Sequence, residues 1–138
     1  MKFLLAIIIS FSLYANQFED IFIEAGKYYD INPKLLKAIA KIESNFNPNA
    51  IRVNKNGTKD YGMMQINSIH LRELSFHGID EKQLMEPKIN IFVGAALLDR
   101  HLKIFGKDME SIGRYHSATP QYKYQWLQKL IKAYSNDG

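Results

Sequence analysis

The sequence contains no cysteine among its 138 residues. This absence excludes a disulfide framework and any metal site built on thiolates. The chain also lacks a Lys/Arg run long enough to follow a phosphate backbone, and its formal net charge is only +4. We therefore expect no binding to nucleic acid. The mild basicity fits an anionic wall or membrane surface instead.

Several other motifs are missing. The chain has no Gly-rich phosphate loop, no cysteine nucleophile and no internal repeat. Its four histidines do not pair with acidic residues at the helical spacing of a zinc site, so we expect neither a metal nor a cofactor. The segment around Asn54–Asp60 faintly resembles a calcium loop, but Arg52 stands where the first acidic ligand belongs.

Only one long hydrophobic run is present, and it lies at the N-terminus. Lys2 precedes an apolar stretch from Phe3 to Phe11, and Ala15 offers a cleavage position. The run is too short to span a bilayer comfortably. We therefore expect residues 1–15 to be a signal peptide that sends residues 16–138 to the periplasm or the cell envelope. No stable membrane span is expected after cleavage.

The rest of the chain predicts one mainly α-helical domain. Hydrophobic residues make up 46% of the chain and aromatic residues 12%, enough for a real core. Apolar residues recur at helical spacing, between residues suited to helix ends. The expected helices cover 18–29, 33–44, 87–105, about 109–115 and 120–134, with short ones after Ser68 and Asp80. In the last helix, Leu127, Leu130, Ile131 and Tyr134 form the apolar stripe.

A turn signal interrupts the helical pattern once. Asn54-Lys55-Asn56-Gly57 lies between Ile51 and Val53 on one side and the segment 58–61 on the other. Asn-Gly turns flanked by β-branched residues favour a hairpin. We therefore expect a small β-hairpin, or an irregular loop of the same outline.

One carboxylate continues an apolar helical stripe. Leu36, Ile39, Ala40 and Glu43 fall at helical spacing, and Glu43 lies in the last turn of its predicted helix. There it meets the negative end of the helix dipole, and apolar neighbours desolvate it. Both effects raise the pKa of Glu43, as a general acid requires. The alternative is that Glu43 is solvated or pairs with a lysine such as Lys41.

Four separated motifs carry a family resemblance. They are Glu43-Ser44-Asn45-Phe46, the segment 60–68 (Asp60-Tyr61-Gly62-Met63-Met64-Gln65-Ile66-Asn67-Ser68), the segment 90–95 and the segment 114–120. Together with the Asn54–Gly57 turn, they resemble the lysozyme superfamily and, more narrowly, the soluble lytic transglycosylases. The small secretion-associated members and the invasion-associated IagB group are most similar.

The resemblance implies a lysozyme-like α+β fold and cleavage of peptidoglycan glycan strands. In such enzymes the residue matching Glu43 protonates the oxygen between N-acetylmuramic acid and N-acetylglucosamine. The substrate's N-acetyl group then attacks the anomeric carbon. The same glutamate finally takes the proton of the 6-hydroxyl, which leaves a 1,6-anhydro product. Secretion-apparatus components are the protein partners that this resemblance implies.

The resemblance also implies supporting roles. Ser44 is expected to hydrogen-bond near Glu43 or the substrate N-acetyl group, and Tyr115 to polarise the carboxyl group of Glu43. Asn90 is expected to hold the groove wall by hydrogen bonding. The alternatives are core filling for the methionines, a helix-end role for Asn90 and aromatic packing for Tyr115. The expected groove-lining residues are Met63, Met64, Gln65 and Asn67.

Two positions leave alternatives open. The family carries Asn and Ala where this chain has His116 and Ser117, and we expect His116 to form a supporting hydrogen bond behind the substrate contacts. Asp60 follows Glu43 at a spacing similar to that of chicken-type lysozymes, whose second carboxylate makes them hydrolases. Asp60 is therefore structural, an electrostatic helper, or the partner of Glu43 in hydrolysis. An inactive wall-binding assembly protein is the third alternative.

Overall fold

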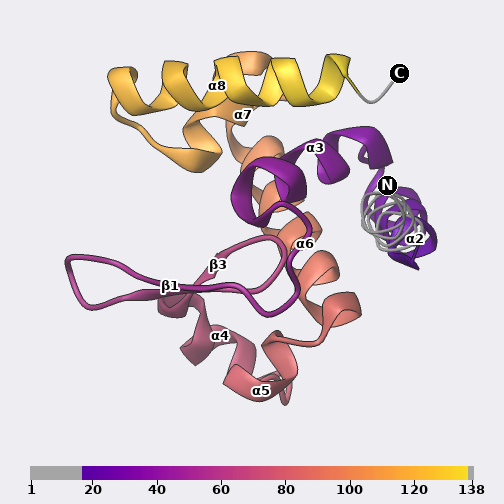
Figure 1. Ribbon diagram of the computed structural model, residues 1–138, viewed down its shortest axis with the longest axis vertical. Helices are drawn as coiled ribbons and strands as arrows, with labels where there is room; N and C mark the ends of the chain where they lie inside the picture. Colours follow the sequence, from indigo (N-terminus) through magenta and orange to yellow (C-terminus); the bar gives the residue numbers. More distant parts are fainter. Residues whose placement is uncertain (1–16, 137–138) are drawn as a thin grey trace, which may run out of the picture.

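The computed structural model describes residues 17–136. These residues form seven α-helices, one short 3₁₀ helix and a three-stranded antiparallel sheet (Figure 1), which confirms the expected mainly helical α+β class. The expected signal peptide, residues 1–15, lies outside the described residues. Across the described part of the chain, no helix is both long and apolar enough to cross a membrane.

Helix α6 (Pro87–Phe105) runs through the centre of the molecule (Figure 1). It begins at Pro87, whose fixed φ suits the first helical turn, and it ends at Gly106, which has a φ of 105°. Ile91 and Leu98 are completely buried on it. Because α6 packs against α2, α5, α7 and β3, it connects the helical part of the molecule to the sheet.

Helices α2 (Glu19–Tyr29) and α3 (Pro33–Ser44) pack against each other, and α2 also packs against α6. The expected start of α3 is confirmed, because the Asn32 side chain accepts a hydrogen bond from the Lys34 backbone N–H. Asn45 ends α3 in the left-handed conformation. Glu43 therefore lies in the last turn of α3, as expected.

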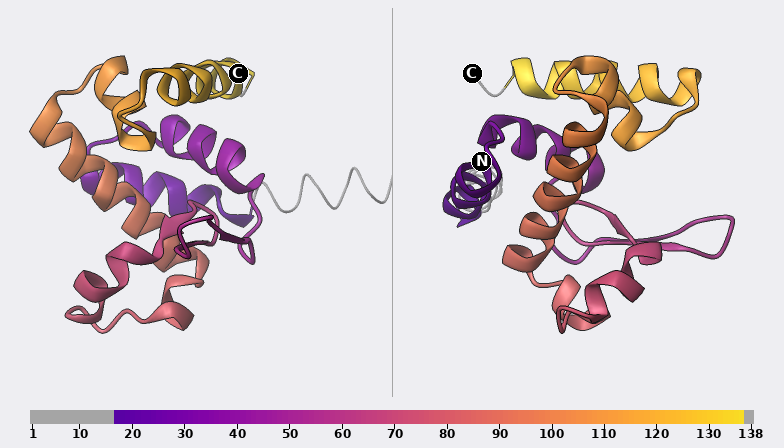
Figure 2. Two further views of the ribbon diagram at one scale, coloured as in Figure 1. Left: turned by 90° about the vertical axis from the view of Figure 1, so that its left-hand side faces the viewer. Right: turned by 180° about the vertical axis from the view of Figure 1, so that it is seen from behind.

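Helices α7 (Met109–His116) and α8 (Pro120–Ser135) form the other end of the molecule. Asp108 caps α7 as expected, by accepting a hydrogen bond from the Ser111 backbone N–H. Helix α8 packs across both α3 and α7 (Figure 2), burying Trp126, Leu127 and Leu130. Ile131 was expected in the same apolar stripe, but it is 52% exposed.

The sheet consists of β1 (Ile51–Val53), β2 (Lys59–Tyr61) and β3 (Ile66–Asn67), in that order. Strands β1 and β2 form the expected hairpin, with Arg52 opposite Asp60. The hairpin extends away from the helices (Figure 2). Strand β3 was not expected from the sequence; it pairs antiparallel with β2 and returns the chain beside Asp60.

Three short helical segments connect the sheet to α6: a 3₁₀ helix (Ser68–His70), α4 (Leu71–Ser75) and α5 (Glu81–Leu84). Asp80 opens α5 with a capping box, as expected. The expected cap at Ser68 is wrong by one residue. The Asn67 side chain reaches ahead to the Ile69 N–H, whereas the Ser68 hydroxyl turns back to accept the Lys59 N–H.

Candidate active site

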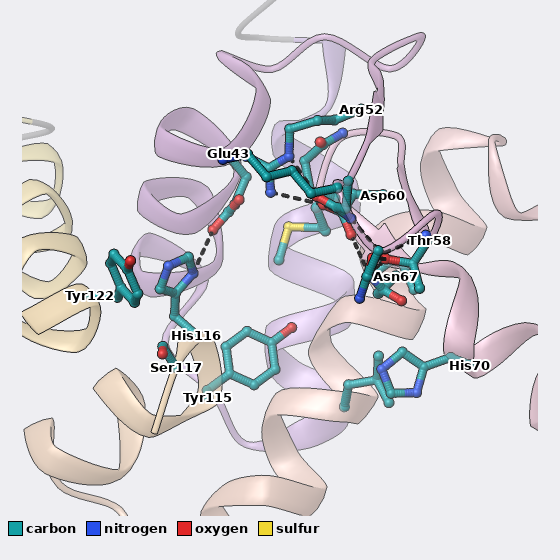
Figure 3. A pocket seen from close by; sticks show the side chains of 17 residues that line it. Glu43, Arg52, Thr58, Asp60, Asn67, His70, Tyr115, His116, Ser117 and Tyr122 are labelled. Carbon is teal, nitrogen blue, oxygen red and sulfur yellow. Dashed lines mark hydrogen bonds and ion pairs between the residues drawn. The ribbon is translucent and has the colours of Figure 1, made fainter. Parts of the chain in front are cut away.

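A cavity of about 740 Å³ lies between α3, the sheet, α6 and α7 (Figure 3). Glu43 forms part of its wall, and Asp60 and Tyr115 line it as well. Most of the remaining lining residues are polar and come from the hairpin and the segment that follows it. The expected site residues in the lining are Glu43, Asp60, Met64, Gln65, Asn67, Tyr115 and His116.

Glu43 is held in apolar surroundings by α3. Leu36, Ile39 and Ala40, which precede it on the same helical face, are almost completely buried, and the Glu43 side chain is only 14% exposed. Burial raises the pKa of Glu43, although the Trp126 hydrogen bond and the nearby Arg52 partly oppose this shift. The alternatives of a solvated carboxylate or a pair with a lysine such as Lys41 do not occur.

Trp126 is the hydrogen-bond donor to Glu43, a role that the motifs did not indicate. Its indole Nε1 lies 2.8 Å from Glu43 Oε1, and the donation comes from α8, 83 residues further along the chain. Sequence reasoning missed this contact because Trp126 belongs to no motif. The only available signal was that it is the single tryptophan of the chain.

His116 lies flat against the indole ring of Trp126. The two ring centroids are 5.0 Å apart and the planes differ by 6°. His116 Nδ1 is 3.7 Å from Glu43 Oε1, too far for a hydrogen bond (Figure 3). Burial lowers the pKa of His116, and the positive charges of Arg52 and Lys129 lower it further. His116 thus faces the cavity beside Glu43, whereas a supporting hydrogen bond behind it was expected.

Asp60 is fixed across the cavity by a dense set of donors (Figure 3). Its Oδ2 accepts hydrogen bonds from Arg52 Nη2 at 2.8 Å, Arg52 Nε at 3.2 Å and Asn54 Nδ2 at 3.1 Å. Its Oδ1 accepts from Asn67 Nδ2 at 2.7 Å. The residue is only 5% exposed. These bonds hold a carboxylate at a defined position in the wall, facing the space beside Glu43.

Tyr115 enters the cavity from α7. Figure 3 shows its hydroxyl directed into the space between Glu43 and Asp60. Burial raises the pKa of Tyr115, and the charge of Glu43 adds to this effect. Tyr115 therefore remains a neutral hydroxyl at physiological pH. Among the hydrogen bonds of residues 17–136, none joins Tyr115 to Glu43, whose partner is Trp126.

Only some side chains of the segment after β2 line the cavity. Met64 lines the cavity, whereas Met63 is completely buried in the core. The expectation that Met63 lines the groove is therefore wrong, and the alternative of core filling holds for this residue. The Gln65 side chain donates to the Gly62 carbonyl at 2.9 Å and to the Ala50 carbonyl at 3.3 Å. It therefore supports the cavity wall that it also lines.

Ser44 and Asn90 lie outside the cavity lining and hold its wall from behind. The Ser44 hydroxyl donates to the Met63 carbonyl at 2.7 Å, so it connects the end of α3 to the segment after β2. Asn90, fully buried on α6, accepts from the Met64 N–H and donates to the carbonyls of Tyr61 and Leu84. The expected wall-holding role of Asn90 agrees with these bonds, whereas Ser44 does not face the cavity.

A second cavity, of about 240 Å³, also borders Glu43. Glu43, Arg52, His116 and Tyr122 line both cavities. Trp126 and Lys129 line only the smaller one, while Asp60 and Tyr115 line only the larger one. Glu43 thus borders two spaces whose linings differ in part.

This arrangement suits proton transfer to a bound polar molecule. A partly desolvated carboxyl group, a neutral tyrosine hydroxyl and a fixed carboxylate surround one open space, which is the set of groups that acid–base catalysis uses. Within the described residues, no group of three or more His, Asp or Glu side chains could hold a metal ion.

Comparison with known proteins gives consistent matches. A family model described as the transglycosylase SLT domain matches residues 20–136. The invasion protein IagB of Salmonella typhimurium is 44% identical over 101 residues, covering 72% of this chain and 63% of IagB. Protein IpgF of Shigella flexneri is 41% identical over 107 residues, covering 76% of this chain and 70% of IpgF. The chain thus spans less than two thirds of the length of IagB.

A solved structure supports the fold. An inactive mutant of the lytic transglycosylase Slt from Pseudomonas aeruginosa superimposes with a TM-score of 0.60. The match covers 83% of this chain but only 20% of that larger protein, at 23% sequence identity. At this identity the similarity establishes the architecture, which confirms the fold expected from the sequence.

Proposed function

The chain belongs to the transglycosylase SLT family, and from this premise we propose that it is a peptidoglycan lytic transglycosylase with Glu43 as its acid and base. The proposed reaction breaks the β-1,4 bond between N-acetylmuramic acid and N-acetylglucosamine. The observation that carries this proposal is the placement of Glu43. Its carboxyl group is nearly buried, has a raised pKa and borders a large cavity whose lining residues are mostly polar.

In the first proposed step, protonated Glu43 donates its proton to the glycosidic oxygen while the bond from that oxygen to the anomeric carbon breaks. The carbonyl oxygen of the N-acetyl group on the same muramyl sugar forms a new bond to the anomeric carbon. Positive charge therefore develops on the sugar. The Asp60 carboxylate, fixed in the wall of the cavity, would stabilise that charge electrostatically.

In the second proposed step, the 6-hydroxyl of the muramyl sugar attacks the anomeric carbon and releases the N-acetyl oxygen. Glu43, now a carboxylate, accepts the hydroxyl proton and returns to its starting state. The product is a 1,6-anhydro sugar, and no water is consumed. Because Glu43 must first give and then take a proton, a pKa raised toward neutrality favours both steps.

The setting of this activity is also a proposal. We infer export to the cell envelope through residues 1–15, and local opening of the wall for a secretion apparatus. The names of the relatives support the second inference, since IagB is an invasion protein. Another relative, of Escherichia coli O157:H7, is named a peptidoglycan-binding-like protein and is 36% identical over 126 residues.

Hydrolysis by Glu43 and Asp60 is the second candidate function. It is favoured by one observation, that Asp60 faces the same cavity as Glu43. Against it, both Asp60 oxygens already accept strong hydrogen bonds, which weakens Asp60 as a nucleophile or base. The lytic reaction needs no second base, so we favour it.

Mass spectrometry of digested peptidoglycan tests the proposal. We expect 1,6-anhydro-muropeptides from the wild-type protein, and their absence alongside reducing-end products would assign hydrolysis instead. Glu43→Gln keeps the size of the side chain but removes the acidic proton that the reaction needs, so turnover should fall to background. The same variant should still sediment with insoluble peptidoglycan. A wild-type protein that sediments but releases no muropeptide would be an inactive wall-binding protein.

A further inference from the structure

The contact between Trp126 and Glu43 has a chemical consequence for the acid. An indole N–H is a donor and can never accept a proton. Trp126 donates to Glu43 Oε1, so the lone pair that Oε1 directs at the indole cannot carry the proton of the neutral acid. Within residues 17–136, no hydrogen bond from a protein group reaches the other oxygen, Oε2.

The two carboxyl oxygens of Glu43 therefore differ, since only Oε1 accepts a hydrogen bond from a protein group in the described part of the chain. The two cavities relate this difference to the space around Glu43. Trp126 lines only the smaller cavity, whereas Glu43 borders both. The indole therefore approaches Oε1 from the side of the smaller cavity. The unbonded oxygen remains available to the larger one, in which Asp60 and Tyr115 lie.

We propose that Trp126 is a positioning residue, which holds Glu43 Oε1 so that the catalytic proton resides on Oε2 and faces the larger cavity. This inference rests on the proposed function, in which Glu43 is the acid. Such a donor avoids the entropy cost of orienting the carboxyl group during the reaction, because the correct rotamer is already selected.

Packing fixes the indole in turn. Trp126 is only 6% exposed, and the His116 ring stacks on it with a 6° angle between planes. The three residues come from three helices, Glu43 from α3, His116 from α7 and Trp126 from α8. Because α8 packs against both α3 and α7, this helical packing holds the three side chains together.

Kinetics of Trp126→Phe test the proposal first. Phenylalanine preserves an aromatic ring against His116 but removes the N–H donor. We expect kcat to fall about tenfold or more, with KM changed less than about twofold, because orientation of the acid is lost while the glycan contacts remain. An unchanged kcat would overturn the proposal.

The pH profile separates positioning from a general structural defect. The Trp126 bond favours the ionised form of Glu43, so its removal raises the pKa of Glu43. The alkaline limb of the rate profile should therefore move to higher pH in Trp126→Phe. Arg52, Asp60, His116 and Lys129 also act on this region, but the substitution leaves them in place. A limb that does not move would contradict the proposal.

A measurement without substrate completes the test. The chain has a single tryptophan, so a ¹⁵N-labelled sample gives one indole N–H resonance, identified by its absence in Trp126→Phe. In a His116→Phe background, which removes the titration of the stacked ring, this resonance should shift with pH as Glu43 ionises. Adding Glu43→Gln should abolish that shift while the amide oxygen still accepts the indole N–H.

The two proposals fail in different ways. If the resonance ignores Glu43→Gln while the wild-type protein releases anhydro-muropeptides, the positioning role is wrong and the proposed function stands. If the resonance reports Glu43 but the wild-type protein cleaves no glycan, the hydrogen bond is real and the proposed function is wrong, so the positioning role falls with it.

Discussion

Asp60 combines a structural and an electrostatic function in one side chain. Its hydrogen bonds from Arg52, Asn54 and Asn67 connect all three strands or their adjoining turn, so the carboxylate fixes the shape of the hairpin base. The same carboxylate borders the cavity beside Glu43 and raises the pKa of that residue. Asp60 therefore couples the geometry of the sheet to the acidity of Glu43.

Replacing Asp60 by Asn should separate these effects. The amide keeps the shape but removes the charge that faces the developing positive sugar, and its N–H₂ group meets donors where the carboxylate accepted. We expect kcat to fall about tenfold or more, with product identity unchanged under the lytic mechanism. Kinetics with soluble glycan strands measure the loss. Asn54→Ala, which removes one donor but keeps the charge, is the control and should lose far less activity.

At the scale of elements, the turn between β2 and β3 depends on α6. Gly62 has a φ of 71°, and a Cβ at this position would lie 2.7 Å from Asn90 Cγ. Asn90 in turn bonds to backbone groups on both sides of the turn. Only a glycine allows the chain to pass so close to the amide that holds it.

Gly62→Ala should therefore destabilise the protein by about 3 kcal/mol, since it combines left-handed backbone strain with a clash against Asn90. Gly57→Ala is a matched control, because Gly57 has a φ of 84° and an added Cβ would meet nothing within 4 Å. Its cost should be about 1 kcal/mol, from backbone strain alone. Urea denaturation followed by circular dichroism measures both, and equal losses would contradict the role of Asn90.

The sequence predicted elements that carry local signals and missed those set by distant partners. The first residues of α3, α5, α6 and α7 were predictable from Asn32, Asp80, Pro87 and Asp108, because N-caps and prolines act within a few residues. Strand β3 has only two residues, and it exists because β2 is available for pairing. Met63 is buried in a short irregular segment, where hydrophobic periodicity does not distinguish a core residue from a groove residue.

The candidate site shows the same division. Glu43 was identifiable because its own helix desolvates it, and the segment 60–67 because a family resemblance extends through it. Trp126 and Arg52 were not identifiable, since their meaning depends on contacts across 83 and 8 residues with the two carboxylates. A residue acquires such a role from the way in which helices and strands pack, and the spacing of residues in the sequence does not predict that packing.

For the whole molecule, the raised pKa of Glu43 lowers the free energy of unfolding at pH values where Glu43 is ionised. Folding favours the protonated form, so the stabilising contribution is complete below the pKa of Glu43 in the unfolded chain. It is lost as the pH rises through the higher pKa of the folded state. At pH values above that higher pKa, the native protein holds an ionised carboxylate in surroundings that disfavour the charge.

Glu43→Gln should consequently raise Tm at pH values above the pKa of Glu43 in the folded state, by an amount equivalent to about 1 kcal/mol. The gain should shrink as the pH falls and disappear below the pKa of an ordinary glutamate. Scanning calorimetry of wild type and variant across this range measures the difference. Glu24→Gln, at an exposed site on α2, should change Tm little at any of these pH values. A variant that gains no stability over wild type as the pH rises would contradict this account.

Arg52, which anchors Asp60, also occupies the middle of an open sheet edge. Strand β1 is at the edge of the sheet, and Ile51 and Val53 on either side of Arg52 are 52% and 67% exposed. An exposed apolar edge strand is a template for pairing with another chain, and a central charge discourages such pairing. Neutral substitutions of Arg52 would therefore promote aggregation. Activity lost in cells carrying them would partly reflect insoluble protein, and purified monomer is needed to measure the effect on the site.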